Sequence, residues 1–229
     1  MNKKSLLTSS LAIGVLACAA MAPSPSVAQV TKQSGKYLFR IKLTKGASYT
    51  YSMTMDVPAV ATGGKAETVS MGWVMKMKSV SNNQADLEVT TTGGPSASAQ
   101  TLQMTINNQG KILKGSAGIT GGFNEFPSGP IAIGGTWTST APVGGMSGKT
   151  TNKLAGFKTV NGRQYAHVTT TSSMSGGGQG MSMTANGDLL IDMRDGLVFR
   201  GTVKSTVKMP PGPQGQPGQF TTTAVINRK

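Results

Sequence analysis

Apolar and polar residues alternate along most of the chain. The pattern is clearest in the segment Ser48–Val57, where every second residue is apolar: Tyr49, Tyr51, Met53, Met55 and Val57. Successive side chains of a β-strand point to opposite faces, so this segment is predicted to be a strand with one apolar face and one polar, solvent-facing side.

The same alternation predicts further strands at 37–43, 71–77, 85–89, 102–106, 181–185, 189–193, 203–209 and 220–226. Asn161-Gly162, Asn186-Gly187 and Asp195-Gly196 are the dipeptides most typical of two-residue hairpin turns. Asn82-Asn83 and residues 107–110 also indicate turns. Adjacent alternating runs joined by short turns predict an all-β, antiparallel meander that forms a curved sheet, a half-barrel or a flattened barrel.

Three stretches rich in glycine and proline interrupt the pattern. Residues 121–148 are expected to form an irregular crossing with one short strand around Trp137. Residues 176–180 and 210–219 are expected to be hairpin loops. Residues 210–219 contain Gly-X-Y triplets, but a collagen helix needs many more of them.

Three pairs of segments resemble each other, which predicts a duplicated β-unit. The matches are 78–92 with 158–171, 109–115 with 195–201, and 45–50 with 135–138. A unit with one apolar face and an open edge gains by pairing with its copy. We therefore expect a single domain at 29–229, with halves at about 36–115 and 134–229.

The N-terminus has the three parts of a secretory signal peptide. Lys3 and Lys4 precede an apolar run at 6–21, and a short polar run ends at Ala28. We expect cleavage after Ala28 and export to the periplasm or the extracellular space, with no transmembrane segment in the mature chain. Cys18, at the end of Val-Leu-Ala-Cys, leaves open the alternative of a lipid-anchored protein.

The chain is basic, with 22 Lys and Arg against 8 Asp and Glu and a formal net charge of +14. Such a charge favours contact with an anionic envelope polymer or with lipid head groups. The lysines occur singly along the predicted strands, however, which favours a role in solubility. No nucleic acid partner is expected.

The histidine and acidic residues of the sequence give little support to a catalytic function. His167 is the one histidine, and no carboxylate close to it in sequence offers a partner for a triad. Asp188, Asp192 and Asp195 are the one close group of acids, and their spacing does not fit a calcium loop. We therefore expect no enzyme activity, no cofactor and no metal site of this kind.

Methionine pairs are the unusual feature of the sequence. Met53 with Met55, Met75 with Met77 and Met181 with Met183 each share one strand face. Thioethers suit Cu(I), which leaves copper binding as an alternative. Packing is the simpler interpretation, because the pairs fall where the alternation already requires core residues.

A curved sheet lined by these residues could also enclose a lipid or another amphiphile. The candidate ligand-binding residues are Met53, Met55, Trp73, Met75, Met77, Met181 and Met183. The sequence does not decide between a packed and a hollow interior.

Several short segments resemble a family of uncharacterised secreted bacterial proteins known as a domain of unknown function. They are Lys45-Gly46-x-x-Tyr49, the Lys-x-Val turn segments, Gly110 to Leu113, and Ile133 to Trp137. The resemblance implies a β-rich fold and an envelope location, and it brings no catalytic residues. The methionine pairs and the Gly-Pro-Gln loop depart from that family.

The sequence thus predicts a non-catalytic exported envelope protein that holds a hydrophobic or amphiphilic ligand in a methionine-rich interior. A structural or polyanion-contacting envelope protein and a copper-binding protein stay open as alternatives.

Overall fold

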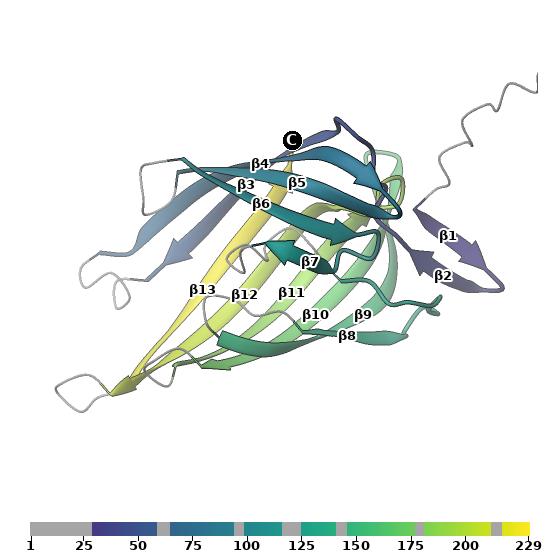
Figure 1. Cartoon of the computed structure of the whole chain (residues 1–229). Helices are drawn as coiled ribbons and strands as arrows, with labels where there is room; N and C mark the ends of the chain where they lie inside the picture. The colour runs from purple at the N-terminus through teal and green to yellow at the C-terminus, as the bar shows by residue number, and fades with distance from the viewer. Residues whose placement is uncertain are drawn as a thin grey trace, which may run out of the picture.

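A computed structural model describes residues 29–58, 65–93, 99–115, 125–140, 146–176, 181–211 and 217–229 (Figure 1). The expected signal peptide with Cys18 lies outside these residues, as do the loop tips at 177–180 and 212–216. The strands of the described part are β1 (Val30–Gln33), β2 (Lys36–Phe39), β3 (Ser48–Val57), β4 (Glu67–Ser81), β5 (Gln84–Gly93), β6 (Gln100–Asn107), β7 (Ile112–Gly115), β8 (Thr136–Thr140), β9 (Met146–Val160), β10 (Arg163–Gly176), β11 (Met181–Asp192), β12 (Val198–Pro211) and β13 (Pro217–Arg228).

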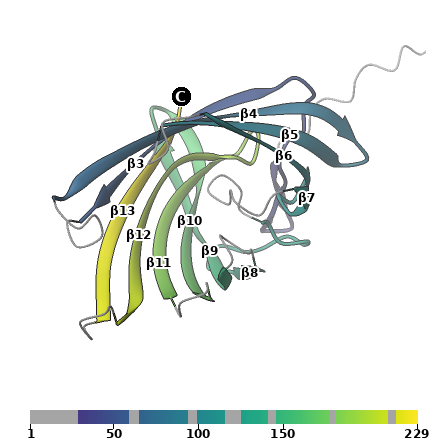
Figure 2. The same ribbon diagram turned by 60° about the vertical axis from the view of Figure 1, so that its left-hand side comes forward.

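Eleven of these strands form one antiparallel sheet in the order β7-β6-β5-β4-β3-β13-β12-β11-β10-β9-β8. Each half of the chain is a meander, and β13 joins the halves by pairing with β3 at Met53↔Ile226 and Met55↔Ala224. The sheet curves strongly (Figures 1 and 2). Its end strands β7 and β8 are not paired with each other in the described residues, so the fold is an open, curved all-β sheet.

The core lies on the concave face of this sheet. Side chains that alternate inward from the central strands are buried there, among them Tyr51, Trp73, Leu87, Val168 and Ile191. Phe39 and Phe126, which lie outside the large sheet, complete the core and stack with ring centroids 5.3 Å apart. The expected period-two alternation thus places one apolar face inside and one polar face outside.

The expected strand at 37–43 is only partly correct. β2 ends at Phe39, and it pairs with β1 in a separate two-stranded sheet. The next residues form a linker whose amides bond to three different segments: Arg40 N to Gln29 O, Ile41 N to Asn108 O, and Lys42 N to Asp195 O. These hydrogen bonds satisfy the backbone amides of residues 40–42, although no strand lies beside them. The alternation of apolar and polar residues therefore continues past Phe39 outside any β-ladder.

Asn186-Gly187 was expected to be a hairpin turn, and that prediction is wrong. Both residues lie within β11, where Gly187 pairs with Thr170 on one side and Val203 on the other. The apolar positions before and after the dipeptide continue in phase, so the strand runs straight through it. A Cβ at Gly187 would collide with Thr170 Oγ1, so glycine serves close packing here.

Most of the other expected turns are confirmed, whereas Asp195-Gly196 lies in a longer connection at 193–197 and does not form a two-residue turn. Asn82-Asn83 joins β4 to β5, Asn161-Gly162 joins β9 to β10, and both asparagines of the first turn have positive φ. β10 pairs with β11 up to Gly176↔Met181, and β12 pairs with β13 up to Pro211↔Pro217. Each of the two expected glycine- and proline-rich loops therefore falls between the two strands of a hairpin. In the crossing, the short strand around Trp137 is β8, while β9 already begins at Met146.

The matching segments of the two halves occupy corresponding places in the strand order. Residues 78–92 form the β4–β5 hairpin, and residues 158–171 form the β9–β10 hairpin. Residues 109–115 lead into β7, and residues 195–201 lead into β12. Segments 45–50 and 135–138 lead into β3 and β8, the first strands of each half.

A charged network fixes the C-terminal strand to the turn between β11 and β12. Arg228 donates to Asp192 Oδ2 at 2.6 Å and to Asp195 Oδ2 at 2.8 Å, and its side chain is 9% exposed. Asp192 is 1% exposed and also accepts from Arg194. The network therefore gives a buried carboxylate several charge-assisted partners.

Candidate functional site

Three of the expected ligand-binding residues belong to the packed core. Trp73, Met75 and Met77 are 7%, 2% and 0% exposed, and they follow one another on the concave face of β4. The sulfur of Met77 also accepts a hydrogen bond from the Thr44 amide at 3.3 Å. These side chains present almost no surface to a ligand.

Two further candidate methionines on the concave face, Met53 and Met55, are only partly buried. Met53 pairs with Met71, and Met55 pairs with Val69, at the far end of β3 and β4. Met53 and Met71 still pack against the core. The apolar face of β3 and β4 thus extends from the core to a more exposed end.

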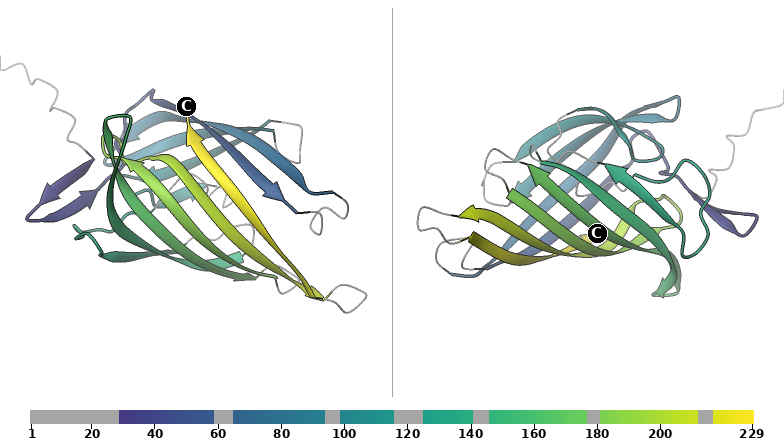
Figure 3. Two further views of the ribbon diagram at one scale, coloured as in Figure 1. Left: turned by 180° about the vertical axis from the view of Figure 1, so that it is seen from behind. Right: turned by 90° about the horizontal axis from the view of Figure 1, so that it is seen from below.

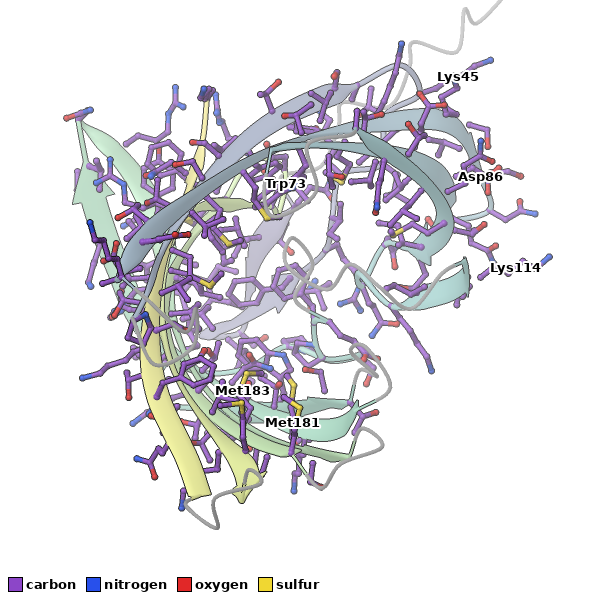
Figure 4. The ribbon with its side chains drawn as sticks, turned by 90° about the vertical axis from the view of Figure 1, so that its left-hand side faces the viewer. Lys45, Trp73, Asp86, Lys114, Met181 and Met183 are labelled. Carbon is purple, nitrogen blue, oxygen red and sulfur yellow. The ribbon has the colours of Figure 1, made fainter. Side chains whose placement is uncertain are left out.

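Met181 and Met183 lie on the concave side of β11, outside the buried core cluster (Figure 4). Met174 of β10 pairs directly with Met183, and Val207 of β12 pairs with Met183 on its other side. Val207 in turn pairs with Phe220 of β13. The partly exposed side chains of this row, which we call the methionine row, are Met174, Met181, Met183, Val207 and Phe220.

Sequence reasoning found Met181 and Met183 but missed Met174. Met174 stands among serines and glycines, so its own segment carries no apolar alternation. The register of β10 with β11 brings it opposite Met183. The signal was the predicted hairpin at 176–180, which sets that register once the loop length is known.

A row of small side chains, four of them hydroxyl-bearing and one an alanine, separates the methionine row from the core. Across five strands the register runs Ser205, Ala185, Ser172, Thr150 and Ser139. Thr150 and Ser172 share a hydrogen bond of 2.8 Å. The concave face therefore has three bands: a packed core, a hydroxyl row and an apolar outer row.

Two buried polar atoms on the concave face have no hydrogen-bond partner among the described residues: Tyr51 Oη and Asn152 Oδ1. Burial raises the pKa of the Tyr51 phenol well above its ordinary value, against the charge of Arg228. Asn152 is 0% exposed and its amide donates weakly to Ser139 Oγ at 3.4 Å. Both groups are poorly solvated, and the charge of Arg228 lies near the Tyr51 phenol.

His167 has a carboxylate partner after all, because strand pairing supplies one that sequence proximity could not. Its Nε2 lies 2.7 Å from Asp188 Oδ2, and Lys158 Nζ lies 3.4 Å from Asp188 Oδ1. Burial raises the pKa of Asp188, but the interactions with His167 and Lys158 together outweigh it, so that the pKa is lowered. The three groups lie on the outer face of the sheet.

The acids that are close in sequence do not form one site. Asp188 faces outward, whereas Asp192 and Asp195 are held by Arg228 at the turn. Within the described ranges, no group of three or more His, Cys, Asp or Glu side chains is placed to hold a metal ion.

Two pockets of the described part lie away from the methionine row. One, of about 390 Å³, is lined by Lys78, Asp86, Gln103 and Lys114 among others. Figure 4 shows Asp86 and Lys114 at the opposite end of the molecule from Met181 and Met183. Asp86 accepts from Ser79 at 2.5 Å and Thr105 at 2.8 Å, and these hydrogen bonds lower its pKa. The second, of about 330 Å³, lies beside Asp56 and Thr223.

No helix in the described part of the chain is long and apolar enough to cross a membrane. No family model matches the sequence. No curated protein matches it either. The resemblance to a family of secreted bacterial proteins therefore stays a prediction, and the functional proposal rests on the geometry of the sheet.

Proposed function

We propose that the protein is a non-catalytic, exported binding protein that holds an amphiphilic ligand on the concave face, at the methionine row. The observation that carries the proposal is the position of Met181 and Met183. They point to the same side as the core, yet they are partly exposed and lie outside the core cluster. Apolar side chains on that side that are not packed against the core of the described residues are available to an apolar ligand.

The chemistry of the row fits a flexible acyl chain. Methionine is unbranched and polarisable, so a group of methionines adapts to ligands of varied shape. The adjacent hydroxyl row, with Ser172 and Thr150, offers hydrogen bonds to a polar group. An amphiphile satisfies both bands at once, whereas a purely apolar ligand would cover the hydroxyl row without offering it further hydrogen bonds.

The outer face gives no comparable support to catalysis. His167 and Asp188 form a hydrogen-bonded pair there, but neither lines the pockets described above. A nucleophile and a substrate pocket beside the pair would be needed for hydrolysis.

The experiment is ligand retention followed by probe binding. We expect the purified protein to release an amphiphile on organic extraction and to show its mass under native conditions. A dansylated fatty acid should bind wild type, and the double variant Met174→Gln with Met183→Gln should bind it about tenfold more weakly, as expected for losing two apolar contacts. Val74→Gln, at a 37% exposed residue on the outer face, is the matched control and should bind normally.

Two results would overturn the proposal: a protein that yields no extracted amphiphile and binds no probe, or a probe affinity that the methionine substitutions leave unchanged. Circular dichroism of the variants shows whether the sheet is intact, so a folding defect is recognised separately.

Copper binding is the second candidate, favoured by the pairing of Met174 with Met183 beside Met181. This register brings three soft thioethers to neighbouring positions on one face. Titration of apo protein with Cu(I) against a chelating competitor tests it. Binding weaker than micromolar, or binding that survives the double methionine variant, excludes this candidate.

A further inference from the structure

The outer face of the C-terminal half carries four lysines that have no ion pair or side-chain hydrogen bond within the described residues: Lys149, Lys153, Lys204 and Lys208. All four are exposed. From residue 136 onward the chain has three acids, of which Asp192 and Asp195 are bound by Arg228. The third, Asp188, is held by His167 and Lys158. The four lysines therefore form a positive surface, and the nearest acid beyond β12 in the row of Lys204 is Asp56 of β3, two strands away.

Strand register arranges these lysines in a regular order that their sequence spacing hides. Lys153 pairs with Thr169, and Lys149 pairs with Ser173, along β9. On the other side of β10 and β11, Lys204 pairs with Asn186 and Lys208 pairs with Ser182.

The four lysines fall in four successive cross-strand rows. The rows run through Thr169–Asp188, Thr171–Asn186, Ser173–Thr184 and Ser175–Ser182. Lys153 borders the first, Lys204 the second, Lys149 the third and Lys208 the fourth. Positive charges thus alternate between the two sides of a path that follows β10 and β11. The ribbon seen from behind shows the curved strands of this half running side by side (Figure 3, left).

The dimensions of this path follow from sheet geometry. Outward residues of one strand repeat every two positions, so successive rows lie about 6.8 Å apart, and β9 and β12 are about 14 Å apart. The floor between them consists of hydroxyl and amide side chains, including Thr171, Ser173, Thr184 and Asn186. We call the four lysines and this floor the lysine strip.

We propose that the lysine strip binds a linear phosphodiester polymer whose chain runs parallel to the strands. A polymer with a three-carbon bridge between successive phosphates, such as poly(glycerol phosphate), matches the row spacing when it is nearly extended. Each phosphate then meets one lysine, on alternating sides, and the hydroxyl floor donates hydrogen bonds to phosphate oxygens. Asp188, in the row of Lys153, marks the end of the path. This proposal concerns the face opposite the methionine row and does not depend on the amphiphile.

The test is the binding of a poly(glycerol phosphate) oligomer to the full chain at several salt concentrations. Changing all four strip lysines to Gln should weaken binding at least about tenfold and reduce the slope of log K against log salt by about 3, near 0.7 for each lost phosphate contact. The control Lys32→Gln, Lys36→Gln, Lys45→Gln and Lys76→Gln removes the same charge elsewhere and should leave the slope nearly unchanged.

A second variant keeps both charge and composition and alters the alternation alone. The exchanges Thr151→Lys with Lys153→Thr, and Thr206→Lys with Lys208→Thr, place two lysines in each of two rows and empty the other two. All four positions lie on the outer face, so folding should be preserved, which thermal unfolding checks. The proposal expects binding at least about threefold weaker, with a smaller salt slope.

Three outcomes would overturn the proposal. Wild type that does not bind the oligomer excludes the site, and equal losses in strip and control variants assign the binding to net charge. Tighter binding of single-stranded oligodeoxythymidylate, or of vesicles containing phosphatidylglycerol, through the same lysines assigns the strip to nucleic acid or to a membrane surface instead.

Discussion

Tyr51 and Trp73 stack almost parallel at the centre of the concave face, with ring centroids 5.1 Å apart and ring planes 9° apart. They are direct register partners on β3 and β4. Tyr51 is 1% exposed, and its hydroxyl makes no hydrogen bond of good geometry with the described residues, although Arg228 lies close enough to oppose the rise of its pKa. The aromatic ring therefore stabilises the core, while the hydroxyl is buried at a cost.

Replacing Tyr51 by Phe should leave the free energy of unfolding unchanged or raise it by about 1 kcal/mol, because the substitution removes a buried hydroxyl that has no hydrogen bond of good geometry. Tyr51→Ala should lower it by about 3 to 5 kcal/mol through loss of the ring. Urea unfolding measures both. A clear loss of stability in the Phe variant would contradict the prediction and reveal a hydrogen bond to the hydroxyl.

Arg228 should be the most important single charge for stability. Its removal by Arg228→Ala leaves Asp192, which is 1% exposed, without one of its two arginine partners, and frees Asp195. Removing one partner of a buried ion pair costs about 3 to 5 kcal/mol. Arg200→Ala, at an exposed arginine bonded to Asn227, should cost less than about 1 kcal/mol. Similar urea midpoints for the two variants would show that the network contributes little.

The same network makes stability depend on acid pH. Burial raises the pKa of Asp192, but hydrogen bonds from Arg194 and the charge of Arg228 outweigh it, so the folded-state pKa lies below the ordinary 3.8. A carboxyl with a lowered pKa stabilises the folded state above its unfolded pKa, and that stabilisation is lost as pH falls through the folded pKa. We expect the urea midpoint to fall below about pH 4. Asp192→Asn should be less stable at neutral pH, and its urea midpoint should fall less steeply with decreasing pH than that of wild type. An equally steep fall in both proteins would show that Asp192 is not the titrating group.

Much of the fold could be predicted from sequence because one face of the sheet is buried. Ser48–Val57 is β3 with the bounds that its alternation indicated, and Asn161-Gly162 forms the expected hairpin. Because every second side chain of a strand is buried, apolar residues recur at every second position of the sequence. Two-residue turns require residues that tolerate positive φ. Local rules were sufficient for these elements.

The candidate sites depend on register, which local rules do not give. Met174 and Met183 meet because β10 pairs with β11, and Asp188 reaches His167 through the same pairing. Lysines that looked scattered along single strands become an ordered strip when β9 to β12 lie side by side. Contacts between strands distant in sequence follow from the whole topology, and no single segment encodes them.

Gly187 tests the one turn that sequence reasoning misplaced. Because it lies mid-strand against Thr170 Oγ1, Gly187→Ala should lower the free energy of unfolding by about 1 to 3 kcal/mol through overpacking. Thr170→Ala removes the colliding atom, so the double variant should recover at least about 1 kcal/mol of that loss as a coupling energy. Gly162→Ala, at a turn with φ of 73° and open space around it, should be destabilised by backbone strain that Thr170→Ala does not relieve. Additive effects at Gly187 and Thr170 would instead mean that backbone conformation, and not side-chain contact, requires the glycine in β11.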